Sequence, residues 1–548
     1  MIGVRSYILT LFLLFSALGW TQGNIEPKDV KEPSTGPAEI KISRRVEPMN
    51  MHWLNKIDES NAYFSYSEEI QYHSSILPLL PNYNIGETAD APVQYSKNKL
   101  QFNFRKSPAK WDAKVYPITD LSIGSEIRNQ EINPLYSLGI GAGLDFRTKK
   151  FFFTSKLLPY TNDVAYVADS IQRSTHADVG TTRPIIDQLY QRSEIIAVYR
   201  PHEFFTFVGG YGKNFFGDGY RSLLLSDNSS NHPYLKLETS FGSIKYVNLY
   251  NVWNDNSVDP SNKALDKMKF SAAHYLSWNV TRNFNIGVFE TVVWQYNDTL
   301  VDRGFDINYL NPVVFYRPVE YGQGSADNVL LGLNTSLKLR QKHCIYGQMI
   351  LDEFLLSEIR ARSRWWGNKY GFQVGYKSND FLNKGAYFQT EFNVVRPYTY
   401  QHISSTLSYG HLNGSVVHPI GANFFEVLNI VSFKPLKMKD GPLKELRITN
   451  KINWISTGYD TSAVNYGQNV FTSYQGRFGE FDQKIMQGLR TNILNENLIL
   501  EVPLIKAIHL YANVTYNYRM SWNRINSEHQ HYLTVGIRSR LWNRYTDF

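Results

Sequence analysis

The sequence predicts an all-β protein, a large antiparallel transmembrane β-barrel of roughly 14–18 strands with a small N-terminal periplasmic or plug-like element. Three observations favour this fold class. Apolar and polar side chains alternate along much of the chain, aromatic residues make up 15% of it, and its first 20 residues have the pattern of a secretory signal. Since successive side chains of a strand point to opposite faces, such runs can present one face to lipid and the other to a polar lumen.

The alternation is clearest between Phe204 and Tyr250. The apolar positions are Phe205, Phe207, Gly209 and Tyr211 and, after a polar loop, Leu235, Leu237, Thr239 and Phe241. Similar runs recur within residues 136–147, 284–288, 331–340, 370–377, 508–519 and 532–542. They are about as long as the roughly 9–11 residues that a tilted strand needs to cross a bilayer. Lys338, Arg340 and Arg519 fall on the polar side, as expected where a lipid-facing charge costs roughly 2–4 kcal/mol.

Composition agrees with a barrel rather than with membrane-spanning helices. The chain has 548 residues, of which 43% are hydrophobic, and its mean hydropathy is −0.35. After residue 20 no run approaches the roughly 20 apolar residues that a spanning helix requires. The 37 Tyr and 11 Trp are residue types that prefer membrane interfaces, where they form aromatic girdles. An aromatic-rich soluble β-protein is the alternative interpretation.

Charge and motifs exclude several functions. The formal net charge of +8 is spread along the chain without a basic run or a recognition helix, so no nucleic-acid partner is expected. The basic residues either meet anionic glycans and lipopolysaccharide phosphates or form an ordinary solvated surface. Cys344 is the only cysteine, which excludes an intrachain disulfide. We find no HExxH, G-x-S-x-G or P-loop motif and no metal-ligand spacing among the 13 His, and we therefore predict neither an enzyme nor a cofactor.

Three regions are predicted along the chain. Residues 1–19 read as a signal peptide, with Arg5 before a short apolar core and small residues near the cleavage position. Residues 20–110 read as a periplasmic leader and plug-like segment, because prolines and charges dominate its first half. Residues 111–548 read as the barrel of a cell outer-membrane protein. The terminal aromatic, Phe548, resembles the signal by which the barrel assembly machinery recognises its substrates, but it is out of phase with Leu533 to Leu541, so a bulge or a short overhang is expected.

Two clusters of polar and aromatic residues suggest a glycan-binding site. Sugars are held by aromatic faces and by planar amide, carboxylate and guanidinium groups. The predicted residues are Asp218, Tyr220, Arg221, Asp227, Asn228 and Trp253 in the first cluster and Asn311, Arg317, Glu320, Asp327 and Asn328 in the second. The alternative is that these are turn residues that cap strands and carry no ligand.

The same two clusters carry a family resemblance. The segments GGYGKNFFGDGYRSLLLSDN (209–228), LNPVVFY (310–316) and SADNVLLG (325–332) resemble the Wzi capsule-assembly family. The aromatic-rich style of residues 110–548 is also similar to RemB-type gliding motility proteins of Bacteroidetes. The resemblance implies an outer-membrane barrel that binds or organises surface polysaccharide in capsule or exopolysaccharide assembly and supports gliding. Its implied partners are polysaccharide, outer-membrane lipid and lipopolysaccharide, and motility or adhesin components.

A second functional class stays open at this point. The barrel could instead be a porin-like channel for small anionic or sugar solutes, with Lys338, Arg340 and Arg519 lining its lumen. A barrel enzyme such as a lipid A hydrolase ranks third.

Overall fold

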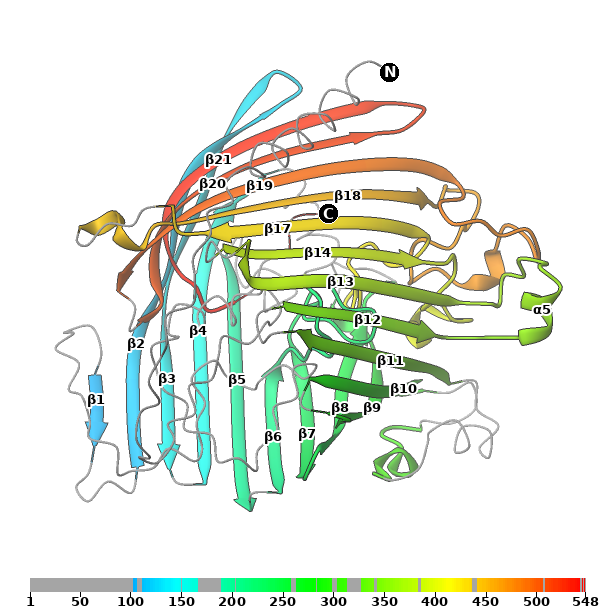
Figure 1. Ribbon diagram of the computed structural model, residues 1–548, viewed down its shortest axis with the longest axis horizontal. Helices are drawn as coiled ribbons and strands as arrows, with labels where there is room; N and C mark the ends of the chain where they lie inside the picture. Colours follow the sequence, from blue (N-terminus) through cyan, green and yellow to red (C-terminus); the bar gives the residue numbers. More distant parts are fainter. Residues whose placement is uncertain are drawn as a thin grey trace, which may run out of the picture. The chain divides into compact units, whose positions relative to one another are not determined.

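Antiparallel strands make up almost all of the regular structure (Figure 1). The computed structural model describes residues 102–105, 111–165 without 149, 189–257 without 203, 263–297 without 282, 303–312, 327–339, 343–435 without 383–385, 441–542 without 506 and 507, 545 and 547. Within these residues the only α-helix is α5, Leu356–Arg360. No described helix is long and apolar enough to cross a membrane.

The strands follow one another along the chain. They are β1 Phe102–Arg105, β2 Trp111–Arg128, β3 Glu131–Thr148, β4 Phe151–Asp163, β5 Leu189–His202, β6 Phe205–Gly212, β7 His232–Phe241, β8 Ile244–Asp255, β9 Lys267–Asn279, β10 Phe284–Gln295, β11 Asn328–Leu339, β12 His343–Leu351, β13 Tyr370–Phe381, β14 Ala386–Val395, β15 Gly410–His411, β16 Gly414–Ser415, β17 Phe424–Phe433, β18 Arg447–Tyr459, β19 Leu489–Ile505, β20 Leu510–Trp522 and β21 Ser527–Ser539. Short 3-10 helices lie in the loops: η1 Lys263–Leu265, η2 Ile307–Leu310, η3 Ser405–Leu407, η4 Pro442–Glu445 and η5 Tyr474–Gly476.

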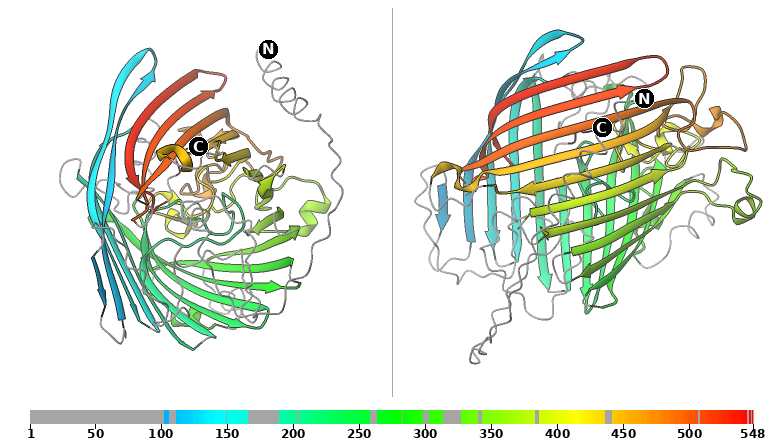
Figure 2. Two further views of the ribbon diagram at one scale, coloured as in Figure 1. Left: turned by 60° about the vertical axis from the view of Figure 1, so that its left-hand side comes forward. Right: turned by 45° about the horizontal axis from the view of Figure 1, so that its top comes forward.

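The sheet closes on itself (Figure 2). Each long strand from β2 onward pairs antiparallel with the next, and β14 pairs with β17 because β15 and β16 form a separate two-stranded ribbon. The closing contact joins β2, over Asp120–Arg128, to β21. Of the 19 strands in the sheet, β1 pairs only with β2, which leaves 18 in the closed ring. This even number lies within the predicted range.

The first strand of the closed ring is β2, which begins at Trp111. β21 covers β2 only from Asp120 onward, and β1 pairs with Asp112 to Val115 of the same edge. β1 therefore covers backbone groups that would otherwise be exposed on an unpaired strand edge. β1 lies within the predicted plug-like segment, while the signal peptide and the rest of that segment, residues 1–101 and 106–110, fall outside the described residues.

Side chains alternate between the two faces of the barrel wall as predicted. In β3, Leu138 and Ile140 are 49% and 67% exposed, whereas Ser137 on the same strand is buried. In β13, Phe372 is exposed and its neighbour Gln373 is buried. An apolar outer face and a polar inner face are what lipid outside and a polar interior require. A closed barrel with this outer surface is an outer-membrane protein.

The two ends of the barrel differ in the length of their connections. At one end, five connections between consecutive strands of the ring are long: 213–231, 296–327, 352–369, 396–423 and 460–488. At the other end the strands are joined by two to four residues, except at 434–446. Outer-membrane barrels have short periplasmic turns and longer extracellular loops, so the long-loop end indicates the cell exterior. The chain enters β2 and leaves β21 at the short-turn end.

Candidate functional site

The loop between β6 and β7 folds into the barrel. Every residue from 214 to 231 is buried, and the segment lies inside the ring of strands (Figure 2). Its turn is held by Ser222, whose Oγ donates to the Phe216 carbonyl at 2.6 Å and accepts from the Leu224 N–H at 3.1 Å. Gly217 adopts a φ of +142°, which a side chain would disfavour. The sequence therefore makes a tight, self-bonded turn that can enter the lumen without leaving its backbone unpaired.

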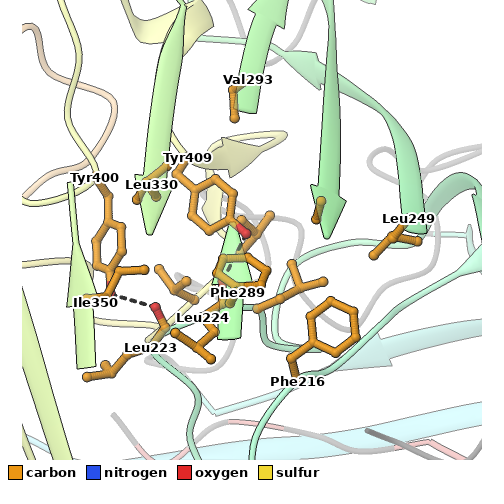
Figure 3. Packing of buried hydrophobic residues seen from close by; sticks show 14 of the residues in the cluster. Phe216, Leu223, Leu224, Leu249, Phe289, Val293, Leu330, Ile350, Tyr400 and Tyr409 are labelled. Carbon is orange, nitrogen blue, oxygen red and sulfur yellow. Dashed lines mark hydrogen bonds between the residues drawn. The ribbon is translucent and has the colours of Figure 1, made fainter. Parts of the chain in front are cut away.

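Apolar residues of this turn pack against apolar residues of the inner wall (Figure 3). Phe216 stacks on Tyr275 of β9 with ring centroids 4.8 Å apart. Tyr400 donates to the Leu223 carbonyl at 2.9 Å. Burial of these side chains produces a core inside the barrel, where an open pore would contain water.

A second loop, residues 396–423, interlocks with the first. The Ser226 N–H donates to the Val416 carbonyl at 2.7 Å, and Asn228 donates through Nδ2 to the carbonyls of Ser415 and Val417. Val416 and Val417 are themselves buried. We call residues 213–231 and 396–423 together the plug, because they interlock inside the ring of strands; this plug is distinct from the plug-like segment predicted within residues 20–110.

Arg221 is at the centre of the polar side of the plug. Its Nη2 lies 3.1 Å from Asp547 Oδ1 and 3.4 Å from Glu426 Oε1. The neighbouring Tyr220 donates to Asp547 Oδ2 at 2.9 Å, and its N–H donates to Glu391 at 2.8 Å. All these groups are buried, so the Arg221 charge is balanced by carboxylates of the chain itself.

The segment after β21 also enters the lumen and reaches the plug. Tyr545 donates to Asp227 Oδ1 at 2.6 Å, and both residues are buried. The chain leaves the last strand after Ser539, three residues earlier than the predicted strand end at Trp542. The overhang that the phase of the chain end predicts is therefore present, although Phe548 itself lies outside the described residues.

Asp218 and Trp253 have partners within the barrel as well. Asn334 donates to Asp218 Oδ2 at 2.9 Å, and Lys377 donates to the Asp218 carbonyl at 2.6 Å. Trp253 is fully buried on β8 and meets the Tyr409 ring edge-on at 5.6 Å. Both residues fix the plug to the inner wall.

The second predicted cluster forms a separate clamp outside the plug. Arg303 donates twice to Asp327, at 2.9 and 2.8 Å, and Tyr309 donates to the same carboxylate at 2.6 Å. Asn328 donates to the Leu407 carbonyl at 2.9 Å, while Asn311 is exposed at the end of η2. Arg317 and Glu320 lie outside the described residues. The structure thus describes nine of the eleven predicted residues and divides them between the buried plug, the wall strand β8, the loop clamp and an exposed turn. Their glycan-binding role stays a prediction.

Sequence reasoning missed a third group of residues, at the long-loop end. The loops 352–369 and 460–488 dock on each other through backbone bonds: Trp366 N–H to the Glu480 carbonyl at 2.9 Å and Gln483 N–H to the Arg364 carbonyl at 3.1 Å. We call the docked residues, 363–369 and 460–488, the cap. They lack the two-residue rhythm of strands, and their only sequence signal is aromatic residues spaced among glycines, as in Tyr474 to Phe481.

The cap combines aromatic rings with charges of both signs. The Arg477 guanidinium lies 4.3 Å from the Trp366 ring centroid, and Phe478 and Phe481 are 62% and 54% exposed. Arg364 and Asp482 are exposed and 3.7 Å apart. Exposed rings beside guanidinium and carboxylate groups form the kind of surface that can bind a sugar through its C–H face and its hydroxyls.

Two ionisable groups contact the cap: the buried Asp352 carboxylate lies 3.6 Å from the Lys369 ammonium, and the half-buried His402 meets the Tyr474 ring edge-on. Burial raises the pKa of Asp352 to about 6, although the nearby Lys369 ammonium opposes the shift. Burial, with Lys369 again, lowers the pKa of His402 to about 3. Among the described residues no group of three or more His, Cys, Asp or Glu side chains is placed to hold a metal ion.

No protein-family model and no curated protein matches the chain. Solved outer-membrane barrels resemble it at low identity. Wzi of Escherichia coli, described as an outer membrane protein involved in group 1 capsule assembly and a carbohydrate-binding β-barrel, is 10% identical over 76% of this chain and 84% of its own, with a TM-score of 0.46. Pseudomonas aeruginosa OprD is 7% identical over 77% and 94%, with a TM-score of 0.40, and OpdL of the same organism is 8% identical over 78% and 98%, with a TM-score of 0.41. At these TM-scores the likenesses add nothing to what the strand pairing of the chain shows by itself.

Proposed function

We propose that this outer-membrane barrel binds surface polysaccharide at its cap and keeps its lumen closed with its plug. The observation that carries the proposal is the pairing of a lumen filled by its own loops with exposed Phe478 and Phe481 beside Arg477 and Asp482 at the outer end. A protein whose interior is occupied must meet a polymer on its surface, and the cap offers both stacking and hydrogen-bonding groups there.

The proposal also includes specific cellular roles, capsule assembly and gliding motility. Membership of the Wzi or RemB-type families, and with it capsule assembly and gliding motility, rests on the resemblance of residues 209–228, 310–316 and 325–332. The proposal contains no catalytic step. Loss of capsule staining in a deletion strain would support a role in assembly, and loss of surface movement would support one in gliding.

Binding of fluorescently labelled exopolysaccharide to intact cells tests the cap. We expect F478A/F481A to weaken binding about 30-fold, because each ring contributes on the order of 1 kcal/mol of stacking. The matched control is F204A/F241A, which removes two exposed rings in mutual contact at the short-turn end and leaves the cap unchanged. Equal binding by both variants, with folded barrels confirmed by heat-modifiable mobility, would reject the cap as the site.

A channel is the second candidate, and the charged inner wall favours it. Lys338 and Arg519 lie half-buried on strands of the wall, and Arg540 is fully buried with Glu501 2.9 Å away. Arg340 lies outside the described residues. A planar-bilayer recording separates the two candidates: a plugged binder is nearly silent, whereas steady anion current through the unmodified protein would favour the channel.

A further inference from the structure

The arm that leads from β12 into the cap exposes a short apolar surface. Phe354, Leu355, Leu356 and Ile359 are 46%, 45%, 47% and 38% exposed. Leu355 and Leu356 precede Ile359 by four and three residues, so α5 gathers these side chains on one side. Such a cluster on a single turn is unfavourable in water and indicates an apolar surrounding.

The backbone of this arm is ordered by its own hydrogen bonds. The Leu355 N–H donates to Asn368 Oδ1 at 2.7 Å, and the Ala361 N–H donates to the Ser357 carbonyl at 2.9 Å. The arm is therefore held with its apolar side chains outward.

Two arginines flank the apolar surface. Arg360 ends α5 and Arg362 follows it, and both are exposed. Within the described part of the chain neither has an ion-pair partner, whereas the nearby Glu353 is taken by Lys369 at 3.0 Å. Both arginines can therefore meet an external anion.

The position of the arm indicates which kind of anion Arg360 and Arg362 meet. Figure 1 shows α5 beyond the ends of β12 and β13. The outer faces of these strands are apolar, with Ile345 45% and Val374 59% exposed, so lipid covers them. The arm continues directly from Leu351 at the long-loop end. Its surroundings are then the headgroups of the outer leaflet.

We propose that the arm, residues 352–362, is a binding site for a phosphorylated lipid of the outer leaflet, of the lipid A type. Arg360 and Arg362 bind its phosphates, and Phe354, Leu355 and Ile359 contact its acyl chains. Arginine suits phosphate because its planar fork donates two parallel hydrogen bonds. The proposal requires only the barrel and its orientation, and it does not depend on polysaccharide binding at the cap.

The test measures lipid retained by the full-length protein in nanodiscs, by native mass spectrometry. The probes are bisphosphorylated lipid A and the same lipid without phosphates. We expect R360Q/R362Q to weaken retention of the phosphorylated lipid about 30-fold, while retention of the dephosphorylated lipid stays unchanged. K150Q/K444Q removes the same charge from two exposed positions at the short-turn end and serves as the control.

Three results would overturn the proposal. Equal retention of phosphorylated lipid A by R360Q/R362Q and the unmodified protein would remove the arginines from the site. An equal loss in K150Q/K444Q would show that only net charge matters. If the unmodified protein forms oligomers and R360Q/R362Q does not, with lipid retention unchanged, the arm is assigned to self-association. Polysaccharide binding by intact cells, measured in parallel, reports on the cap separately.

Discussion

The Arg221 guanidinium and the Asp547 carboxylate meet 3.1 Å apart, although 326 positions separate them in the chain. Arg221 belongs to a loop that enters from the long-loop end, and Asp547 to a segment that follows β21 at the short-turn end. Burial alone would raise the pKa of Asp547, but Arg221 and Lys451 hold it below its usual range. This pair therefore joins segments that enter the lumen from opposite ends.

Replacing Arg221 with Met should open the lumen. The substitution leaves Glu426 and Asp547 buried without their shared cation, at a cost of about 3–5 kcal/mol. Undocking the plug relieves this cost without unfolding the wall, so we expect R221M to conduct steadily in planar bilayers. R221K keeps a cation and should remain nearly silent. If R221M is silent too, the pair does not hold the plug.

Acidification should loosen the loop 396–423. Burial, with His232 and Lys269 nearby, lowers the pKa of His411 well below its usual range. In the neutral form, His411 Nδ1 accepts the Asn254 N–H at 3.0 Å, and a proton there would break this bond.

The direction of this pH dependence follows from the lowered pKa values of the two histidines. The docked loop keeps His402 and His411 neutral, whereas the undocked loop binds protons below about pH 6.5. The docked state of the loop therefore has its full stability above that pH. Its stability falls as the pH decreases, by up to about 1.4 kcal/mol per pH unit for each histidine. Amide exchange in residues 396–423, corrected for intrinsic rates, should rise between pH 7.5 and 5.5. H411Q should reduce this dependence, and pH-independent protection in the unmodified protein would contradict it.

The barrel wall could be predicted from the sequence because the two faces of a strand are set by position alone. Leu138, Ile140 and Phe372 face outward for that reason, whatever their distant neighbours are. The plug could not be predicted in this way. The turn around Asp218 and Ser222 has the composition of an exposed loop, and only tertiary contacts, such as Gln348 Oε1 accepting the Leu223 N–H at 2.9 Å, replace water there.

For the predicted site, too, local groupings could be predicted and long-range partners could not. Sequence reasoning placed Asp218, Arg221 and Asp227 in one cluster because they lie within one loop. It could not show that Lys377, Glu426 and Tyr545 already hold them, since these partners come from distant parts of the chain. The cap was missed because irregular loops lack a periodic pattern.

Gly467 should be essential for docking the cap. It adopts a φ of +89°, and an added Cβ would lie 2.4 Å from the Tyr398 backbone nitrogen. We expect G467A to weaken docking by about 1–3 kcal/mol. The Tyr398 N–H donates to the Gly467 carbonyl at 2.9 Å, so its exchange rate reports the loss directly. G476A is the control, because the nearest atom to its added Cβ is 4.0 Å away. Equal exchange in both variants would show that the loop adapts.

Asp327 should stabilise its loop clamp independently of any ligand. D327N removes the charge that Arg303 and Tyr309 share, and we expect the clamp to lose about 1.5–3 kcal/mol. The Tyr309 N–H, which donates to the Asp306 carbonyl at 3.3 Å, should then exchange faster.

The exposed Asn311 provides the control, since N311A should change stability by less than about 0.5 kcal/mol. Polysaccharide binding, measured on the same cells, decides between the two interpretations of Asp327. A clamp residue loses amide protection and leaves binding at the cap unchanged. If D327N abolishes binding while Tyr309 stays protected, Asp327 is a ligand contact, as the sequence predicts, and its bonds to Arg303 and Tyr309 position it for that role.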